Sequence, residues 1–78
     1  MKIEVYTKDN CIYCVKTKDL LKNHNYEFDE YKMGDTITRD QIVSTFPGWK
    51  TLPIIVIDGK FIGGFTDLEK WIKDNNEG

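Results

Sequence analysis

The sequence contains few of the residues from which metal centres and charged binding surfaces are usually built. Its 78 residues include only two cysteines and a single histidine, His24. Structural zinc normally takes four protein ligands, so a zinc centre built on one cysteine pair would lack partners. The 11 basic and 13 acidic residues give a formal net charge of -2, and basic residues do not form a stripe interleaved with aromatics. We therefore expect neither a bound metal nor a nucleic-acid partner.

Long hydrophobic runs are also missing. No apolar stretch approaches the roughly 20 residues that a membrane-spanning helix needs, and residues 1–4 lead into a strand pattern without the features of a signal peptide. We therefore expect no membrane partner, a cytoplasmic location, and one domain over residues 1–78 that acts as a monomer. In a reducing cytoplasm, two neighbouring cysteines are more often catalytic or metal-binding than structural.

The most informative feature that is present is the tetrapeptide Cys11-Ile12-Tyr13-Cys14. Residues 2–6 before it alternate polar and apolar side chains, which predicts a half-buried strand. Residues 15–23 after it predict a helix with one face formed by Cys14, Thr17, Leu20 and Leu21. Cys11 then lies near the first turn of that helix, where backbone N–H groups lack partners and a thiolate is favoured. This placement indicates thiol–disulfide chemistry.

The middle of the chain predicts a second strand and a short helix. Residues 26–31 alternate as a strand, and because one helix separates them from the first strand, the two strands should pair in parallel. A loop over residues 33–36 follows. Thr38 and Gln41 have the spacing of a capping box, which predicts a helix that ends at Pro47-Gly48 and buries Ile42, Val43 and Phe46.

The last third of the chain predicts a hairpin and a closing helix. Residues 52–57 form a β-branched run of the kind that is buried on both faces of a sheet. Asp58-Gly59 is a strong two-residue turn, which returns the chain through residues 60–62. Thr66 and Glu69 have capping-box spacing, which predicts a helix capped by Thr66 with an inward face of Leu68, Trp71 and Ile72. The predicted order is β-α-β-α-β-β-α, an α/β fold with a mixed four-stranded sheet flanked by helices.

Three short motifs, in this order and at these separations, make the chain resemble a dithiol glutaredoxin of the thioredoxin-fold superfamily. They are Tyr6-Thr7-Lys8 leading to the cysteine pair, then Thr51-Leu52-Pro53, then Gly63-Gly64-Phe65-Thr66-Asp67. The resemblance covers nearly the whole sequence. It implies a thioredoxin-like fold and an enzyme that reduces protein disulfides and glutathione mixed disulfides. Glutathione would be its co-substrate and partner, with no tightly bound cofactor.

The resemblance also implies roles for residues beside the reacting sulfur. Cys11 resembles the attacking thiol and Cys14 the resolving thiol, while Pro53 resembles a cis-proline that faces the active site. A cis bond there would leave the backbone of Leu52 available to the cysteine unit of glutathione, as a strand pairs with an extended peptide. Thr51 belongs to the same motif and is expected to line the site.

Further residues of a glutathione site are implied at its two ends. The γ-glutamyl end should be held by Thr66 and Asp67 at the start of the last helix, with Gly64 allowing close backbone approach. The glycine carboxylate should lie within reach of Lys8. Arg39 is a second candidate cation for that carboxylate.

Position 12 departs from the commonest motif of the family, which has proline after the first cysteine. Ile12 keeps an N–H group and more backbone freedom than proline would, so the reduction potential does not follow from the resemblance. Tyr13 is expected to wall the substrate groove. Trp49 and Lys50 are expected in a loop near the cleft, where an aromatic side chain could contact protein substrates.

The chemistry requires Cys11 to ionise easily, since the thiolate is the attacking form and free cysteine has a pKa of about 8.5. A helix terminus contributes about 0.3–2 kcal/mol to such a shift, and an exposed Lys8 about 1 kcal/mol more. We therefore expect direct hydrogen bonds from the backbone N–H groups of Tyr13 and Cys14 to contribute the larger part.

Two other functions would use the same residues. The dithiol could be recharged by a thioredoxin reductase and donate electrons to a ribonucleotide reductase, although Lys8, Thr66 and Asp67 favour glutathione. A dimer could instead hold an iron–sulfur cluster through Cys11 and glutathione. Small glutaredoxins that do so usually have a slim residue, often glycine or serine, near the first cysteine, so Ile12-Tyr13 argues against a cluster.

Overall fold

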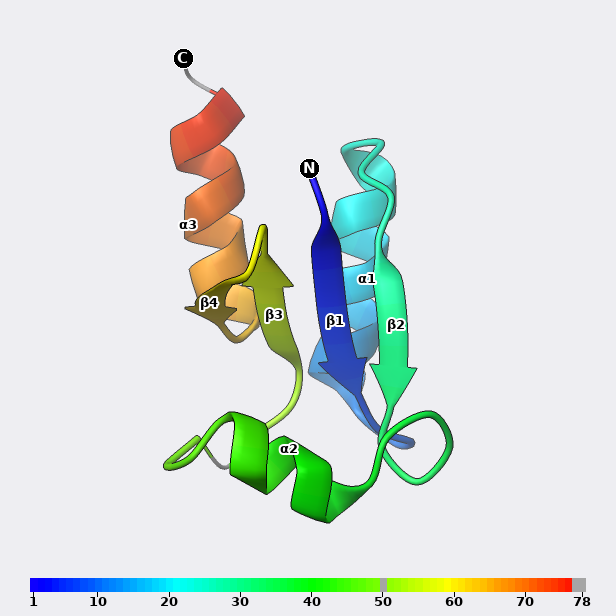
Figure 1. Cartoon of the computed structure of the whole chain (residues 1–78). Coiled ribbons are helices and arrows are strands. Elements are labelled where there is room, and N and C mark those ends of the chain that lie inside the picture. Colours follow the sequence, from blue (N-terminus) through cyan, green and yellow to red (C-terminus); the bar gives the residue numbers. More distant parts are fainter. Residues whose placement is uncertain (50, 77–78) are drawn as a thin grey trace.

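Among residues 1–49 and 51–76, which the computed structural model describes, four short strands form one mixed sheet (Figure 1). They are β1 (Ile3–Thr7), β2 (Asp29–Lys32), β3 (Ile54–Ile57) and β4 (Lys60–Gly63), in the spatial order β2-β1-β3-β4. β1 runs parallel to β2 and antiparallel to β3, and β3 runs antiparallel to β4. The predicted order of elements and the predicted mixed sheet are confirmed.

Two helices, α1 (Ile12–Asn23) and α3 (Phe65–Asn76), lie on one face of the sheet (Figure 1). Side chains alternate between the two faces along a strand, and every second residue of β1 is buried beneath these helices. The main core joins both helices to the two central strands through Ile3, Val5, Leu21, Ile55, Ile57, Leu68 and Ile72. No helix in the described part of the chain is long and apolar enough to cross a membrane.

The third helix, α2 (Arg39–Thr45), packs at the other face near the end of β1 and the start of β3 (Figure 1). A second, smaller core forms there around Ile42, Ile54 and Val56, with Tyr6, Met33, Ile37, Phe46, Trp49 and Leu52 packed against it. The predicted capping box is present, because Thr38 and Gln41 exchange side-chain and backbone hydrogen bonds. β3 is therefore buried on both faces, as the sequence predicts.

Two strands begin later than their sequence patterns suggest. β2 starts at Asp29 rather than at Tyr26, because the N–H of Tyr26 bonds to the carbonyl of Leu21 and closes the end of α1. Tyr26 still packs against the main core from the connection. β3 starts at Ile54, since Pro53 has no N–H to donate to a sheet.

Two predicted side-chain placements are wrong. Val43 is 52% exposed, because α2 is only seven residues long and turns Ile42 toward the sheet, which leaves the next position facing out. Thr66 does not cap α3, since the helix already begins at Phe65. The carboxylate of Asp67 accepts the N–H of Gly64 at 2.9 Å instead, so the cap comes from inside the helix.

Candidate active site

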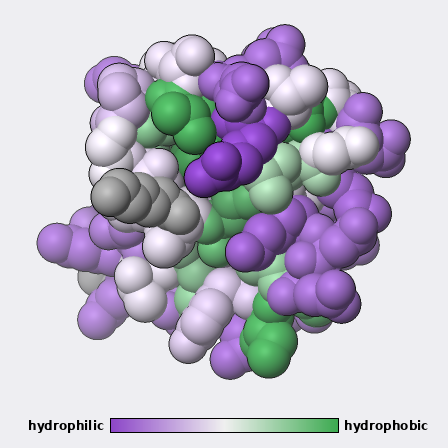
Figure 2. Space-filling view, turned by 90° about the horizontal axis from the view of Figure 1, so that it is seen from below, coloured by the Kyte–Doolittle hydropathy of each residue, from purple (hydrophilic) through white to green (hydrophobic). Residues whose placement is uncertain are grey.

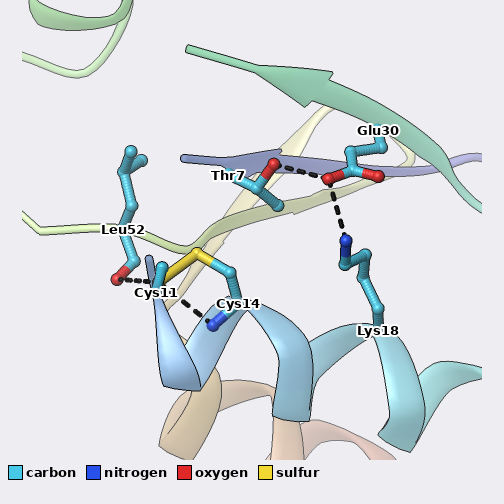
Figure 3. The surroundings of a disulfide bond; sticks show 6 residues. All are labelled: Thr7, Cys11, Cys14, Lys18, Glu30 and Leu52. Atoms are coloured by element: carbon cyan, nitrogen blue, oxygen red, sulfur yellow. Dashed lines mark hydrogen bonds and ion pairs between the residues drawn. A yellow bond between two sulfur atoms is a disulfide. The ribbon is translucent and has the colours of Figure 1, made fainter. Parts of the chain in front are cut away.

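Cys11 and Cys14 are joined by a disulfide in this structure, so the dithiol is in its oxidised form (Figure 3). Their Cα atoms are 5.2 Å apart. Cys14 is 1% exposed, on the buried face of α1 that the sequence predicts. Cys11 is partly exposed at the surface. A reagent from solution therefore reaches Cys11 before it reaches Cys14.

Cys11 is the N-cap of α1, as its expected position near the first turn requires. Its backbone is extended, with φ -123° and ψ 104°, and its Sγ accepts the backbone N–H of Cys14 at 3.1 Å. This is one of the two donors that the sequence suggests, and it is stronger toward a thiolate than toward a neutral thiol. Ile12, the residue that departs from the common motif, is the first residue of the helix and is 72% exposed.

The segment before β3 brings a backbone carbonyl to the reacting sulfur. The carbonyl oxygen of Leu52 lies 3.7 Å from the Sγ of Cys11 (Figure 3). A disulfide sulfur carries no proton, so this contact becomes a hydrogen bond only when Cys11 is a protonated thiol. The peptide bond between Leu52 and Pro53 is cis, as expected, and Pro53 is buried.

A groove of about 430 Å³ lies between Tyr13, which separates the two cysteines, and the start of α3. We call it the α3 groove, and it is lined by Tyr13, Trp49, Thr51, Leu52, Pro53, Gly64, Phe65, Thr66 and Asp67. The rings of Tyr13 and Phe65 are 5.8 Å apart at its wall. The first turn of α3 lies at its far end, where unpaired N–H groups favour a carboxylate.

A second groove, of about 460 Å³, lies against α2 on the other side of Leu52. We call it the α2 groove, and it is lined by Lys8, Met33, Arg39, Ile42, Val43, Gly48, Trp49, Thr51, Leu52 and Ile54. Among these residues the charged side chains are those of Lys8 and Arg39, and both are cationic. Trp49, Thr51 and Leu52 line both grooves, so the two adjoin at Leu52, the residue that contacts Cys11.

A polar cluster of Thr7, Glu30 and Lys18 lies on the other side of the disulfide from Leu52 (Figure 3). The carboxylate of Glu30 accepts the hydroxyl of Thr7 at 2.6 Å and the ammonium of Lys18 at 3.2 Å. The Thr7 hydrogen bond, together with Lys18, holds the pKa of the Glu30 carboxyl below its ordinary value. An open hollow of about 580 Å³ connects Lys18 and Glu30 with the cysteine pair.

The fold thus brings the sequence-predicted site residues together in two sets. Seven of them line the α3 groove, and four line the α2 groove, with Thr51 and Leu52 counted in both. Sequence reasoning gave no role to Phe65 and placed Trp49 only near the cleft, yet both line the α3 groove. The aromatic character of these two residues was the available signal. Lys50, expected beside Trp49, lies outside the described residues.

The family model for glutaredoxin matches residues 3–62, which include the cysteine pair and the cis-proline. The chain belongs to the glutaredoxin family. A protein described as a probable glutaredoxin from Synechocystis is 40% identical over 68 residues, covering 86% of this chain and 77% of that protein. Glutaredoxin 3 of Escherichia coli is 37% identical over 67 residues, covering 85% and 80%.

Solved glutaredoxin structures have the same fold. Glutaredoxin 1 from Francisella tularensis, complexed with cacodylate, superposes with a TM-score of 0.80 at 31% identity, covering 99% of this chain and 98% of that one. The predicted thioredoxin-like fold and the predicted family are therefore confirmed. With the Cys11–Cys14 pair in place, this glutaredoxin is a thiol–disulfide oxidoreductase.

Proposed function

We propose that this glutaredoxin uses glutathione as its reductant and reduces glutathione mixed disulfides and protein disulfides. The observation that supports this most is that the α2 and α3 grooves adjoin at Leu52, whose carbonyl contacts Cys11. Their far ends differ in what they offer. The α3 groove ends at the first turn of α3, which contains the carboxylate of Asp67. The α2 groove contains two cationic side chains, Lys8 and Arg39.

Glutathione has the complementary sequence of groups. Its γ-glutamyl unit carries both a carboxylate and an ammonium, which the N-terminus of α3 and the Asp67 carboxylate would hold. Its central cysteine unit would pair with the backbone of Leu52, which places the glutathione sulfur at Cys11. Its glycine carboxylate would then reach Lys8 and Arg39 in the α2 groove.

On a glutathione mixed disulfide, the Cys11 thiolate attacks the glutathione sulfur. A bond forms between Cys11 and glutathione, and the substrate leaves as a thiolate that takes a proton from water. A second glutathione thiolate then attacks the glutathione sulfur of this new mixed disulfide. The products are glutathione disulfide and the Cys11 thiolate, so Cys14 takes no part in this cycle.

On a protein disulfide, Cys11 forms a mixed disulfide with the substrate and Cys14 resolves it. Cys14 loses its proton and attacks Cys11, which releases the reduced protein and leaves the Cys11–Cys14 disulfide of this structure. Two glutathione molecules then reduce that disulfide and become glutathione disulfide. A ribonucleotide reductase is one such protein substrate that the family resemblance suggests.

The source of electrons is tested by comparing two reductase systems on one small mixed disulfide. We expect turnover with NADPH, glutathione and glutathione reductase, and much less with NADPH and thioredoxin reductase. Turnover that depends on thioredoxin reductase alone would show that the proposed reductant is wrong.

The division of work between the two cysteines gives a sharper test. We expect Cys11→Ser to abolish turnover of both substrate types, because the attacking sulfur is lost. Cys14→Ser should keep turnover of glutathione mixed disulfides and lose turnover of protein disulfides, measured in the glutathione reductase assay. A Cys14→Ser enzyme that is inactive on glutathione mixed disulfides would contradict the mechanism.

A further inference from the structure

The α2 groove offers more apolar surface than the glycine end of glutathione can use. Its apolar walls are formed by Met33, Val43 and Trp49 over the buried Ile42 and Ile54, and its volume is about 460 Å³. Viewed from the side on which α2 lies, the molecule shows hydrophobic surface near the centre of this face with hydrophilic side chains around it (Figure 2). A glycine has no side chain to bury against such a floor.

The groove is also well placed to receive a polypeptide whose cysteine is under attack. It shares Leu52 with the α3 groove, and the Leu52 carbonyl contacts the Sγ of Cys11. Lys8 lines both the α2 groove and the hollow around the cysteine pair. A chain that follows the orientation proposed for glutathione therefore enters the α2 groove with the residues that come after its cysteine.

The charges of the groove select among such chains. Arg39 and Val43 are four residues apart, so they lie on the same side of α2, and both line the groove. An apolar side chain can therefore lie on the floor while an acidic side chain nearby reaches Arg39 or Lys8. A basic side chain at that place would meet two like charges.

We propose that the α2 groove is a specificity subsite for protein disulfides, and that it favours a segment in which the target cysteine is followed by an apolar and then an acidic residue. This inference rests on the proposed function, since the glutathione orientation sets the direction of the chain. The apolar side chain of the substrate packs against the groove wall that the glycine unit of glutathione, which has no side chain, leaves uncovered. The acidic side chain takes the place of the glycine carboxylate.

The test uses the Cys14→Ser protein and short blocked peptides whose cysteine carries a 2-thiopyridyl disulfide. The Cys11 thiolate attacks the peptide sulfur, a bond forms between Cys11 and the peptide, and pyridine-2-thione leaves and is followed by its absorbance. The peptides have leucine–glutamate, glycine–glutamate or leucine–lysine after the cysteine. We expect second-order rate constants about tenfold higher for leucine–glutamate than for glycine–glutamate. We expect the rate constant for leucine–glutamate to be about threefold higher than that for leucine–lysine, and this ratio should decrease with added salt.

Two surface variants of α2 provide a matched pair. Val43→Asn should reduce the leucine-over-glycine ratio, because it removes exposed apolar surface from the groove. Ser44→Asn changes the neighbouring exposed residue, which does not line the groove, and should leave the ratio as it was. Arg39→Gln should reduce the glutamate-over-lysine ratio.

The results separate this inference from the proposed function. Glutathione carrying the same 2-thiopyridyl group, together with the glutathione reductase assay, reports on the proposed function. If glutathione is processed while the peptide ratios are near one, or if Val43→Asn leaves the leucine ratio unchanged, the subsite is overturned. If peptides show the expected ratios but glutathione supports no turnover, the subsite is supported and the choice of glutathione as reductant is wrong.

Discussion

At Cys11 one side chain serves both the helix and the chemistry. Helix N-caps are usually serine, threonine, aspartate or asparagine, whose oxygen accepts an N–H from the first turn. Here the Sγ of Cys11 accepts that hydrogen bond from Cys14. Ionisation of the sulfur makes it a better acceptor, so the reactive form and the capped helix stabilise each other. This explains why the backbone, rather than a neighbouring cation, is expected to set the reactivity of Cys11.

Replacing Lys8 tests whether the backbone hydrogen bond contributes more than this cation to the reactivity of Cys11. Lys8 is exposed, and an exposed charge contributes only about 1 kcal/mol. We therefore expect Lys8→Ala to raise the pKa of Cys11 by less than about one pH unit, measured from the pH dependence of Cys11 alkylation in the reduced protein. Lys22→Ala, in the last turn of α1, is the matched control and should have no effect. A rise of several pH units in Lys8→Ala would show that the lysine dominates.

At the scale of elements, each of the three described helices begins in its own way. α1 is capped by a sulfur, and α2 has the full capping box of Thr38 and Gln41. α3 follows Gly64, which has no side chain to cap with, so the Asp67 carboxylate reaches back to the Gly64 N–H. The sequence predicted the start of α2, because a capping box is a local signal, and it placed Cys11 near the first turn of α1. The start of α1 itself lies at Ile12, three residues before the predicted start at Val15. The sequence misplaced the start of α3 because the end of β4 decides where α3 begins.

Gly63 is the residue that makes this junction possible. Its φ is +129°, and a Cβ at this position would overlap the carboxylate of Asp67. We expect Gly63→Ala to lower the free energy of unfolding by about 2–3 kcal/mol, because the backbone is strained and the Asp67 cap is displaced.

Gly64→Ala is the control for that change. A Cβ at Gly64 would lie 3.6 Å from the nearest Trp49 atom, which is ordinary contact. Urea denaturation of the oxidised proteins at neutral pH should therefore show a cost below about 1 kcal/mol for Gly64→Ala. Equal costs for the two variants would mean that the Gly63 conformation is not required.

At the scale of the whole molecule, Glu30 ties three elements together near the cysteine pair. It extends from β2, accepts a hydrogen bond from Thr7 of β1, and pairs with Lys18 of α1. Thr7 is buried, whereas Lys18 and Glu30 are partly exposed, so the hydroxyl bond outweighs the ion pair. The contact joins the edge strand to the helix that carries both cysteines.

This contact makes part of the stability depend on pH. Because the folded protein holds the pKa of Glu30 below its ordinary value of 4.5, the stabilisation is fully present above that pH and is lost as the pH falls below it. We expect Glu30→Gln to cost about 1 kcal/mol in urea denaturation at pH 7, and progressively less as the pH is lowered below about 4.5.

Glu69→Gln removes the same charge from an exposed position on α3 and serves as the control. At pH 7 it should lower the free energy of unfolding by less than Glu30→Gln does. If Glu30→Gln lowered the free energy of unfolding by the same amount down to pH 3, the lost stability would come from packing rather than from the charge.

The sequence by itself determined the order of the elements, the cysteine pair near the start of α1 and the cis-proline motif, since each follows from residues that are neighbours in the chain. The order and spacing of three such local motifs determined the family. Only the tertiary structure decided which distant residues meet. Lys8 and Arg39 share a groove because α2 packs at the end of β1, and Val43 lines it from outside the core. Packing between elements depends on the whole fold, which no local pattern encodes.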